Sequence, residues 1–348
     1  MEQLLLWIGE HKNPIKKERH DDYVMDSIIN YYTDLNPRLA YTPRMLFLDN
    51  GAFTASTHNR ELDRERVLAL QEKLNPDKTI PLDYPFGRHN ASLKKMIESW
   101  EKTKENILYW QSSSSLKGRL VPALHAWNKE SLRDNIRWLQ SKADAEYIAI
   151  GSIVNNNADK FVNARNFFGD RSPNRDLLDM IHLAVKYIQE FSDFKIHMMG
   201  LGSSPLTLHL AYYLGISSTD SSGYRRKAAH GKIILQGTGE RYVGNMLEAT
   251  FGRKKRSDLS REDIMKLAGC RCDSCLRLID SLWLDFKARA IHNEYTIKME
   301  AELAREYMKS GLDKYERYLD SIFVGSSLRY LWRYAKLLRY NKLITEYY

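Results

Sequence analysis

IHMMGLGSSPLTLHLAYYLGISSTD, residues 196–220, contains two short apolar runs separated by an amphipathic segment. The runs are Ile196–Leu201 and Ile216–Thr219, and the segment between them is Pro205–Leu214. Ser204 suits the cap of a helix, Pro205 its first position and Gly215 the residue that ends it. A strand, a helix and a second strand in this order predict parallel strands in one sheet.

The same alternation recurs along the first 240 residues. The other apolar runs are Leu4–Ile8, Met45–Leu48, Ile80–Leu82, Leu120–Leu124 and Tyr147–Ile150. The other amphipathic segments, which predict helices, are Asp21–Tyr32, Leu62–Leu74, Ser92–Tyr109, Glu130–Leu139 and Arg175–Phe191. Seven or eight such units suit a closed (β/α)8 TIM barrel, and an open doubly wound sheet has the same periodicity. No G-x-G-x-x-G follows the first run, which disfavours the dinucleotide-binding form of the open sheet.

The pattern changes after about residue 240. The basic, loop-like stretch Gly252–Lys255 is followed by a cysteine cluster and then by long helical segments. We therefore predict a barrel domain over residues 1–240 and a metal-bound, basic helical extension over residues 241–348 that packs on the barrel.

The composition predicts a folded protein with a polyanionic partner. Hydrophobic residues make up 43% of the 348 residues, which is enough for a full core. Lys and Arg total 53 against 44 for Asp and Glu, a net charge of +9. This balance favours nucleic acid, although a soluble protein can be basic without such a partner. We expect no membrane span, because no apolar run reaches about 18 residues, and MEQLLLWIGE is too short and too acidic at its end for a signal peptide.

Cys270, Cys272 and Cys275 are the chain's three cysteines, and His292 follows Cys275 by 17 residues. Their odd number and tight spacing disfavour a disulfide framework and favour metal binding in a reducing compartment, so we expect a cytoplasmic protein. Three thiolates and an imidazole suit tetrahedral zinc, and because four protein ligands leave no open position, the zinc would be structural. A helix over Arg277–Glu300 would turn His292 towards the cysteines. Inert buried thiols and an ordinary core histidine are the alternatives.

Three of the predicted strands end in a carboxylate: Asp49, Asp83 and Asp220. The carboxyl ends of barrel strands converge on one face, where function sits. Glycosyl transfer uses one carboxylate as nucleophile and another as acid and base, and a third can accept hydrogen bonds from a guanine-like ring. Alternatively, each aspartate caps the helix or turn that follows. Other residues at strand ends are His125, Gly151, Ser152, Met199 and Gly200.

Together these motifs resemble the tRNA-guanine transglycosylase superfamily, roughly over residues 44–295. Asp49-Asn50-Gly51-Ala52-Phe53 is similar to the family's Asp-Ser-Gly-Gly-(Phe/Tyr) segment. Gly200-Leu201-Gly202, followed by Gly215-Ile216 and Asp220, is similar to its Gly-x-Gly…Gly-Ile…Asp stretch. The three cysteines with His292-Asn293 are similar to its zinc site. The motifs occur in family order, and their order makes the resemblance specific.

The resemblance implies a role for each acid. Asp220 would be the nucleophile that forms a covalent link to C1′ when guanine leaves. Asp49 would be the general acid and base for the departing and incoming bases, and Asp83 would read the guanine-like edge. Further base-binding positions would be Phe53 and Met199, which would sandwich the ring, Gly151 and Ser152, which would offer backbone amides, and His125 and Gly200. Phe53 and Met199 fit the barrel core equally well.

The chain also departs from the family pattern. Ser152 stands where a second glycine is usual, His125 where a base-binding glutamine is expected, and the Cys275–His292 interval is shorter than in bacterial tRNA enzymes. The N-terminal motifs of those enzymes and the RNA-binding domain of archaeal relatives are not recognisable. With these departures, the chain resembles the phage and bacterial branch that inserts 7-deazaguanines into DNA. We therefore expect exchange of guanine in DNA for a 7-deazaguanine base, most simply the 7-cyano form. The same exchange on tRNA and an inactive nucleic-acid-binding partner subunit are the alternatives.

Basic residues predict where a nucleic acid backbone would be held. Clusters follow Asp220 and precede the cysteines: Arg225, Arg226, Lys227 and Lys232, then Arg253, Lys254 and Lys255. The terminal segment 328–342 interleaves basic and aromatic residues, but its leucines also suit an amphipathic surface helix. Besides nucleic acid and the free base, a helper protein or a homodimer is left open, and no membrane partner is expected.

Overall fold

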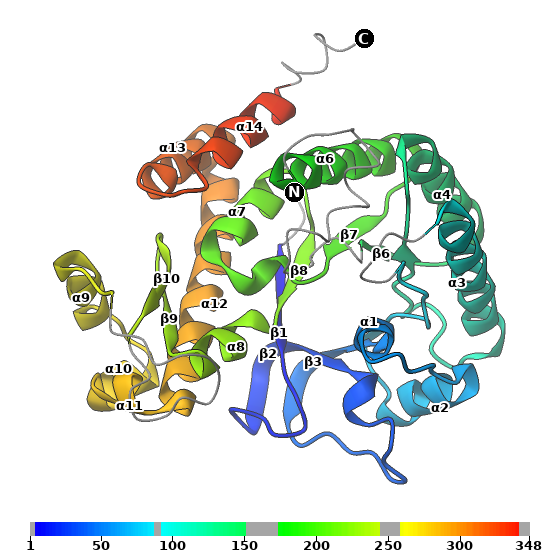
Figure 1. Ribbon diagram of the computed structural model, residues 1–348, viewed down its shortest axis with the longest axis horizontal. Coiled ribbons are helices and arrows are strands. Elements are labelled where there is room, and N and C mark those ends of the chain that lie inside the picture. Colours follow the sequence, from blue (N-terminus) through cyan, green and yellow to red (C-terminus); the bar gives the residue numbers. More distant parts are fainter. Residues whose placement is uncertain (1–3, 87–91, 151–172, 244–257, 341–348) are drawn as a thin grey trace. The chain divides into compact units, whose positions relative to one another are not determined.

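The computed structural model describes residues 4–86, 92–150, 173–243 and 258–340, with the backbone alone for 173–177. The chain divides into two compact units. Figure 1 labels their helices and strands. The first unit comprises Met1–Gly9, Gly200–Tyr213 and Thr219–Arg333, and the second comprises Glu10–Met199, Leu214–Ser218 and Tyr334–Tyr348.

Six strands form the framework of the second unit: β2 (Glu18–Ser27), β3 (Thr42–Asp49), β4 (Lys78–Thr79), β5 (Ala123–Leu124), β6 (Tyr147–Ile150) and β7 (Lys195–Met198). Parallel pairing joins β2 to β3, β3 to β4, β5 to β6 and β6 to β7. A parallel bridge between Thr79 and Leu120 connects β4 to the segment that enters β5. Ser27 pairs with Asp49, so the polar ends of β2 and β3 lie side by side.

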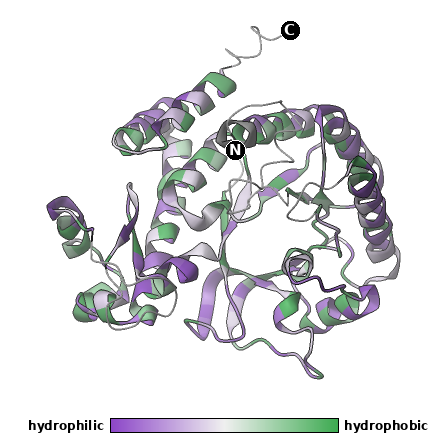
Figure 2. Cartoon of the chain, viewed as in Figure 1, coloured by the Kyte–Doolittle hydropathy of each residue, from purple (hydrophilic) through white to green (hydrophobic). Residues whose placement is uncertain are grey.

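Helices follow these strands: η1 (Ile28–Asn30), α1 (Ala52–Thr57), α2 (Arg64–Leu74), α3 (Leu93–Ser113), α4 (Lys129–Lys142) and α6 (Pro173–Phe191). Local capping explains several of their starts. Asp63 accepts the Arg66 amide at the start of α2, and Asn128 forms a capping box with Ser131 at the start of α4. Figure 2 shows hydrophobic and hydrophilic residues on α3 and α4, as expected of helices with one buried face.

The first unit contains β1 (Leu5–Gly9), which lies next to β8 (Ser218–Ser221), and an antiparallel hairpin of β9 (Lys232–Leu235) and β10 (Gly239–Tyr242). Its helices are η3 (Leu201–Ser203), α7 (Pro205–Tyr213), α8 (Gly223–Ala229), α9 (Arg261–Ala268), α10 (Asp273–Leu278), α11 (Ser281–Leu284), α12 (Phe286–Ser310) and α13 (Leu312–Phe323), and α14 (Arg329–Arg339) follows them. Along the described part of the chain, β1 to β8 are separated mostly by helices, as in a (β/α)8 pattern. The protein is therefore a mixed α/β protein whose parallel strands fit a TIM-like fold.

Two of the predicted helices are wrong in whole or in part. Asp21–Tyr32 forms most of β2 followed by the short η1. Val24, Met25 and Asp26 are all buried, as in strands of parallel sheets that are covered on both faces, so their hydrophobic pattern does not alternate. The predicted helix Arg277–Glu300 is interrupted, because Asp285 caps a new helix, α12, with its side chain.

Three smaller differences concern short elements. The strand predicted over Ile80–Leu82 is instead β4, Lys78–Thr79, which ends just before that segment. The β9–β10 hairpin was not predicted. Helix α3 extends to Ser113, beyond the predicted end at Tyr109.

A buried polar network holds the helices of the first unit together. His209 on α7 and Glu300 on α12 are both fully buried, and Nε2 of His209 lies 2.8 Å from Oε2 of Glu300. The His209 Nδ1 lies 2.8 Å from the Tyr315 hydroxyl, and the Tyr318 hydroxyl donates to Glu300 over 3.0 Å. Burial and the adjacent Glu300 carboxylate raise the pKa of Tyr318. The network therefore links α7, α12 and α13 through the buried His209, Glu300 and Tyr315 and the half-buried Tyr318.

We predict that Glu300→Ala lowers the free energy of unfolding by about 3–5 kcal/mol, because it leaves buried donors without their acceptor. Glu300→Gln keeps part of the hydrogen bonding and should cost less. Glu302→Ala is the control, since Glu302 lies on the same helix with its side chain 55% exposed, and its effect should stay within about 0.5 kcal/mol. Urea unfolding measures all three, and equal effects of Glu300→Ala and Glu302→Ala would contradict a stabilising network.

Candidate active site and metal centre

Asp49 ends β3 and is held by two hydrogen bonds. The Ser27 hydroxyl donates to its Oδ2 over 2.9 Å, and the Gly51 amide donates to the same oxygen over 3.0 Å. Gly51 has φ 76°, a left-handed conformation that favours glycine and lets the chain turn from β3 into α1. Asp49 is half-buried. Its carboxylate is therefore fixed at the carboxyl end of its strand, where the sequence predicted an acid and base.

Asp83 follows β4 and is joined to two other residues from strand ends. Nδ2 of Asn50 donates to Oδ1 of Asp83 over 2.8 Å, and Nε2 of His125 lies 2.7 Å from Oδ2. Asp83 also borders a cavity of about 850 Å³ whose walls come from α1, the segment after it, and the start of α3. The second unit thus brings the predicted residues Asp83 and His125 into contact, and Asn50, which the sequence analysis did not single out, links them to the Asp49 motif.

The other predicted base-binding residues of this unit have less defined surroundings. Phe53 is 40% exposed on α1, and Met199 is half-buried after β7, where its amide donates to the Ile150 carbonyl over 3.4 Å. Gly151 and Ser152 lie outside the described residues. Stacking by Phe53 and Met199 and amide contacts from Gly151 and Ser152 therefore stay predictions.

In the first unit, the predicted nucleophile Asp220 lies in β8 and is 8% exposed. The Gly200 amide donates to its Oδ1 over 2.6 Å. A Cβ added to Gly202 would lie 2.6 Å from the Asp220 carbonyl oxygen, which only glycine avoids. The Gly-x-Gly segment is thus explained by its close approach to β8, and it supplies a backbone donor that orients the Asp220 carboxylate.

The predicted metal ligands Cys270, Cys272, Cys275 and His292 come together in the first unit, with their ligand atoms within 4.8 Å of one another. Nδ1 of His292 lies 3.4, 3.6 and 3.4 Å from the three sulfur atoms in chain order. A tetrahedral zinc ion, at about 2.3 Å from sulfur and about 2.0 Å from nitrogen, sets these atoms about 3.5 Å apart. Hydrogen bonds from the Cys272 and Cys275 thiols lower the pKa of Cys270, whereas hydrogen bonds with Cys270 and Cys272 raise the pKa of Cys275. The four side chains therefore fit a metal ion.

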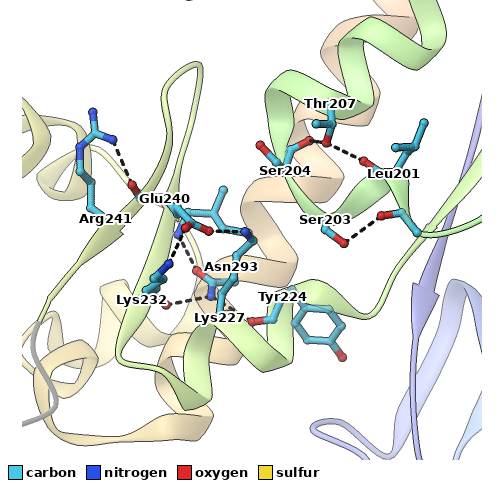
Figure 3. A network of polar contacts seen from close by, with 12 residues as sticks. Leu201, Ser203, Ser204, Thr207, Tyr224, Lys227, Lys232, Glu240, Arg241 and Asn293 are labelled. Atoms are coloured by element: carbon cyan, nitrogen blue, oxygen red, sulfur yellow. Dashed lines mark hydrogen bonds and ion pairs between the residues drawn. The ribbon is translucent and has the colours of Figure 1, made fainter. Parts of the chain in front are cut away.

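The surroundings of His292 also suit a metal ligand. Its Nε2 donates to the Ile234 carbonyl over 2.9 Å, which leaves Nδ1 as the nitrogen that faces the sulfurs. The neighbouring Asn293 accepts the Ile234 amide over 2.7 Å and donates to the carbonyls of Tyr224 and Lys232, each over 3.1 Å (Figure 3). Helix α12, which carries His292, is thus bonded to β9 and to α8, the helix that begins three residues after Asp220.

Two residues of the predicted basic cluster form ion pairs. Lys227 on α8 and Lys232 on β9 both bind Glu240 on β10, and Figure 3 shows the three side chains together. Burial opposes the charge on Lys232, but its bond to Glu240 outweighs burial and raises the pKa of Lys232. Burial likewise opposes the charge on Glu240, whose pKa is nevertheless lowered by the two lysines. Arg225 is half-buried and Arg226 is exposed on α8.

The remaining basic segments are a loop and a helix. Arg253, Lys254 and Lys255 lie outside the described residues. In α14, Leu331, Trp332, Ala335 and Leu338 are buried. The terminal segment is therefore an amphipathic helix, as one of the two readings of the sequence expected. In the described part of the chain, no helix is long and apolar enough to cross a membrane.

Comparison with known proteins places these features in one family. Residues 44–323 match the family described as Queuine tRNA-ribosyltransferase. The tRNA-guanine(15) transglycosylase of Saccharolobus solfataricus is 21% identical over 293 residues, 80% of this chain and 51% of that protein. Its counterpart in Methanosarcina mazei is 23% identical over 277 residues, 76% of this chain and 48% of that protein. The chain thus spans about half the length of these relatives, and it belongs to the Queuine tRNA-ribosyltransferase family.

Proposed function

We propose that the protein is a guanine transglycosylase that exchanges guanine in DNA for a 7-deazaguanine base, with Asp220 as the nucleophile. One observation carries the proposal most directly: Asp220 is an acid of a family motif, and its Oδ1 accepts the Gly200 amide over 2.6 Å. That bond orients the carboxylate for attack on the sugar. Asp49 and Asp83, held at the ends of two other strands, supply the further carboxyl groups that the reaction needs.

The exchange proceeds by two displacements at C1′. A carboxylate oxygen of Asp220 forms a bond to C1′ as the bond from C1′ to N9 of guanine breaks, and Asp49 gives a proton to the departing base. Asp49 then takes the proton from the corresponding nitrogen of the incoming base, which attacks C1′ and releases Asp220. Asp83 accepts hydrogen bonds from the N–H edge of both bases. Each step exchanges one glycosidic or ester bond for another, so no nucleotide triphosphate is consumed.

The other residues have supporting roles in this proposal. Phe53 and Met199 stack on the base, and Gly151, Ser152 and Gly200 line its binding site. Zinc is the ion that we assign to the cysteine and histidine cluster, and it is structural because four protein ligands leave no position for a substrate. Residues 1–240 would form the catalytic barrel and residues 241–348 the zinc-binding extension. Such an enzyme would act in the cytoplasm, where thiolates stay reduced.

The nucleic acid substrate is the point on which two proposals compete. The departures at His125 and Ser152 and the short Cys275–His292 interval favour DNA, whereas the names of the relatives favour tRNA. We would incubate the purified protein with 7-cyano-7-deazaguanine and either duplex DNA, single-stranded DNA or unmodified tRNA, and identify nucleosides by mass spectrometry. A modified deoxynucleoside supports the DNA enzyme, and a modified ribonucleoside alone supports the tRNA enzyme. If labelled guanine also fails to exchange into either polymer, the proposal fails, and a binding subunit is the better account.

Salt dependence tests whether the cluster on α8 and β9 contacts phosphates. We predict that Lys227→Ala and Lys232→Ala each lower affinity for nucleic acid and reduce the slope of log K against log salt by about one. Glu240→Gln should strengthen binding, because it frees both lysines from their ion pairs. Fluorescence anisotropy at several salt concentrations measures these effects. Lys186→Ala, on α6 of the other unit, is the control, and lysine variants with an unchanged slope would limit the cluster to a structural role.

A further inference from the structure

The geometry points to Asn50 and His125 as positioning residues that hold the Asp83 carboxylate in one orientation for a base with two adjacent N–H donors. This inference rests on the proposed function and adds how the recognition carboxylate is fixed. Asn50 donates to Oδ1 of Asp83 over 2.8 Å, while Nε2 of His125 lies 2.7 Å from Oδ2. A carboxylate turns about its Cβ–Cγ bond, and one partner on each oxygen defines the plane in which it lies.

Asn50 is itself fixed by its neighbours. Its Oδ1 accepts the Ala52 amide over 2.8 Å, and its Nδ2 donates to the Pro81 carbonyl over 2.7 Å as well as to Asp83. An amide flipped by 180° would set a donor against the Ala52 N–H and an acceptor against two oxygen atoms. Asn50 is also buried. Its side chain can therefore present only a donor to Asp83.

His125 contacts Asp83 from an enclosed position. Its ring is 5.3 Å from the Phe86 ring and 6.4 Å from the Trp100 ring, measured between centroids, and the residue is 2% exposed. Among the described residues, its Nδ1 has no hydrogen-bond partner and is shielded from solvent. The ring therefore offers no free edge to a bound base. It acts through Asp83, to which Nε2 donates its proton, since an ionised carboxylate only accepts.

Asp83 therefore presents two hydrogen-bond acceptors whose directions are fixed. Each oxygen of Asp83 takes one hydrogen bond from the protein and keeps capacity for another. Asp83 borders the cavity, so the remaining lone pairs are accessible there. Two parallel acceptors match the N1–H and the exocyclic N–H of a guanine-type edge, and a base without the exocyclic amine would leave one acceptor unpaired. Asn50 and His125, which are two of the positions at which the motifs differ from the family, both contact this one carboxylate.

Steady-state kinetics test the inference through the free base. His125→Phe keeps an aromatic ring beside Phe86 and Trp100 but removes the donor, so we expect KM for the free base to rise about tenfold while kcat changes by less than about threefold. His125→Gln returns a donor and should restore KM to within about threefold of the wild type. KM for the nucleic acid should rise less than KM for the free base in His125→Phe, because Asp83 contacts one base of that substrate and its phosphate contacts are unchanged. An unchanged base KM in His125→Phe, or a folded His125→Gln that is not rescued, would overturn the inference.

A second measurement is independent of activity. In protein labelled with ¹⁵N-histidine, the nitrogen shifts of His125, assigned by their absence from His125→Gln, should show the proton on Nε2. In Asp83→Leu, which removes both acceptors, the Nε2 resonance should move, while that of buried His209 should stay. A proton on Nδ1 in the wild type contradicts the inference. If the wild type exchanges no base but the Nε2–H signal responds to Asp83→Leu, the proposed function is wrong. The inference that His125 positions Asp83 is then still supported.

Discussion

Asp220→Asn is expected to reduce the rate of base exchange by roughly 10⁴-fold or more, with the fold unchanged. An amide oxygen does not attack a sugar carbon at a useful rate, so the first displacement is lost. The substitution is nearly isosteric, and the asparagine Oδ1 can still accept the Gly200 amide that now donates to Asp220 over 2.6 Å. Incorporation of labelled guanine into nucleic acid measures the rate, and thermal melting checks the fold.

The covalent intermediate gives the same prediction a second readout. Wild-type protein mixed with nucleic acid should form an adduct that survives denaturation, and Asp220→Asn should form none. Asp49→Asn separates the roles of the two acids: it should slow turnover through loss of proton transfer and leave attack by Asp220 chemically possible. Asp285→Asn is the matched control, because asparagine caps α12 as well as aspartate does. Full activity of Asp220→Asn would remove Asp220 from the mechanism.

The segment 196–220 could be predicted from sequence because its signals are local. Helix α7 begins at Pro205, as the proline at the first helical position predicted. Gly215 has φ 102°, a conformation that other residues rarely adopt, and it lies at the predicted end of the helix. Each of these signals depends on neighbours within a few residues, and the sequence contains those neighbours.

β2 could not be predicted in the same way, because its burial depends on distant residues. Arg19, at the polar start of this strand, is fully buried through ion pairs with Glu10 and Asp22. Asp26 accepts hydrogen bonds from the hydroxyls of Tyr31 and Tyr41, each over 2.7 Å. These pairs turn a charged stretch that looks amphipathic into a covered strand. A hydrophobic pattern contains no information about such compensation.

The same distinction between local signals and contacts with distant residues applies to the candidate site. The aspartates at strand ends were identified because a carboxylate directly after an apolar run is visible in one chain. The partners Ser27 and Asn50 were missed, because their contacts follow from which strands pair and in which register. The signal that the sequence offered for such partners was a polar residue next to each acid at a strand end. All four residues of the cysteine and histidine cluster could be predicted from the sequence, because three of them lie within six residues and the helical phase of α12 turns His292 towards them.

Removing the metal ion is the second large effect that we expect. Cys272→Ser, or treatment of the wild type with a strong chelator, should lower the melting temperature by roughly 10 °C or more and lower activity with it. Cys272 is buried, and its sulfur also accepts the Cys275 amide at the start of α10. Without the ion, three thiol groups and an imidazole are left packed together with few partners. Elemental analysis should find about one zinc per wild-type chain and much less in Cys272→Ser.

Activity should follow metal content because of what His292 is bonded to. A bound ion would be held by Nδ1 of His292, whose other ring nitrogen donates to the Ile234 carbonyl, and Asn293 donates to the Tyr224 carbonyl in α8, the helix that follows Asp220. Loss of the ion therefore loosens the support of the nucleophile's strand without touching the nucleophile. Arg271→Ala, an exposed position between two of the cysteines, is the control and should change neither quantity. A metal-free protein with wild-type melting temperature and activity would show that α12 supports this region by packing alone.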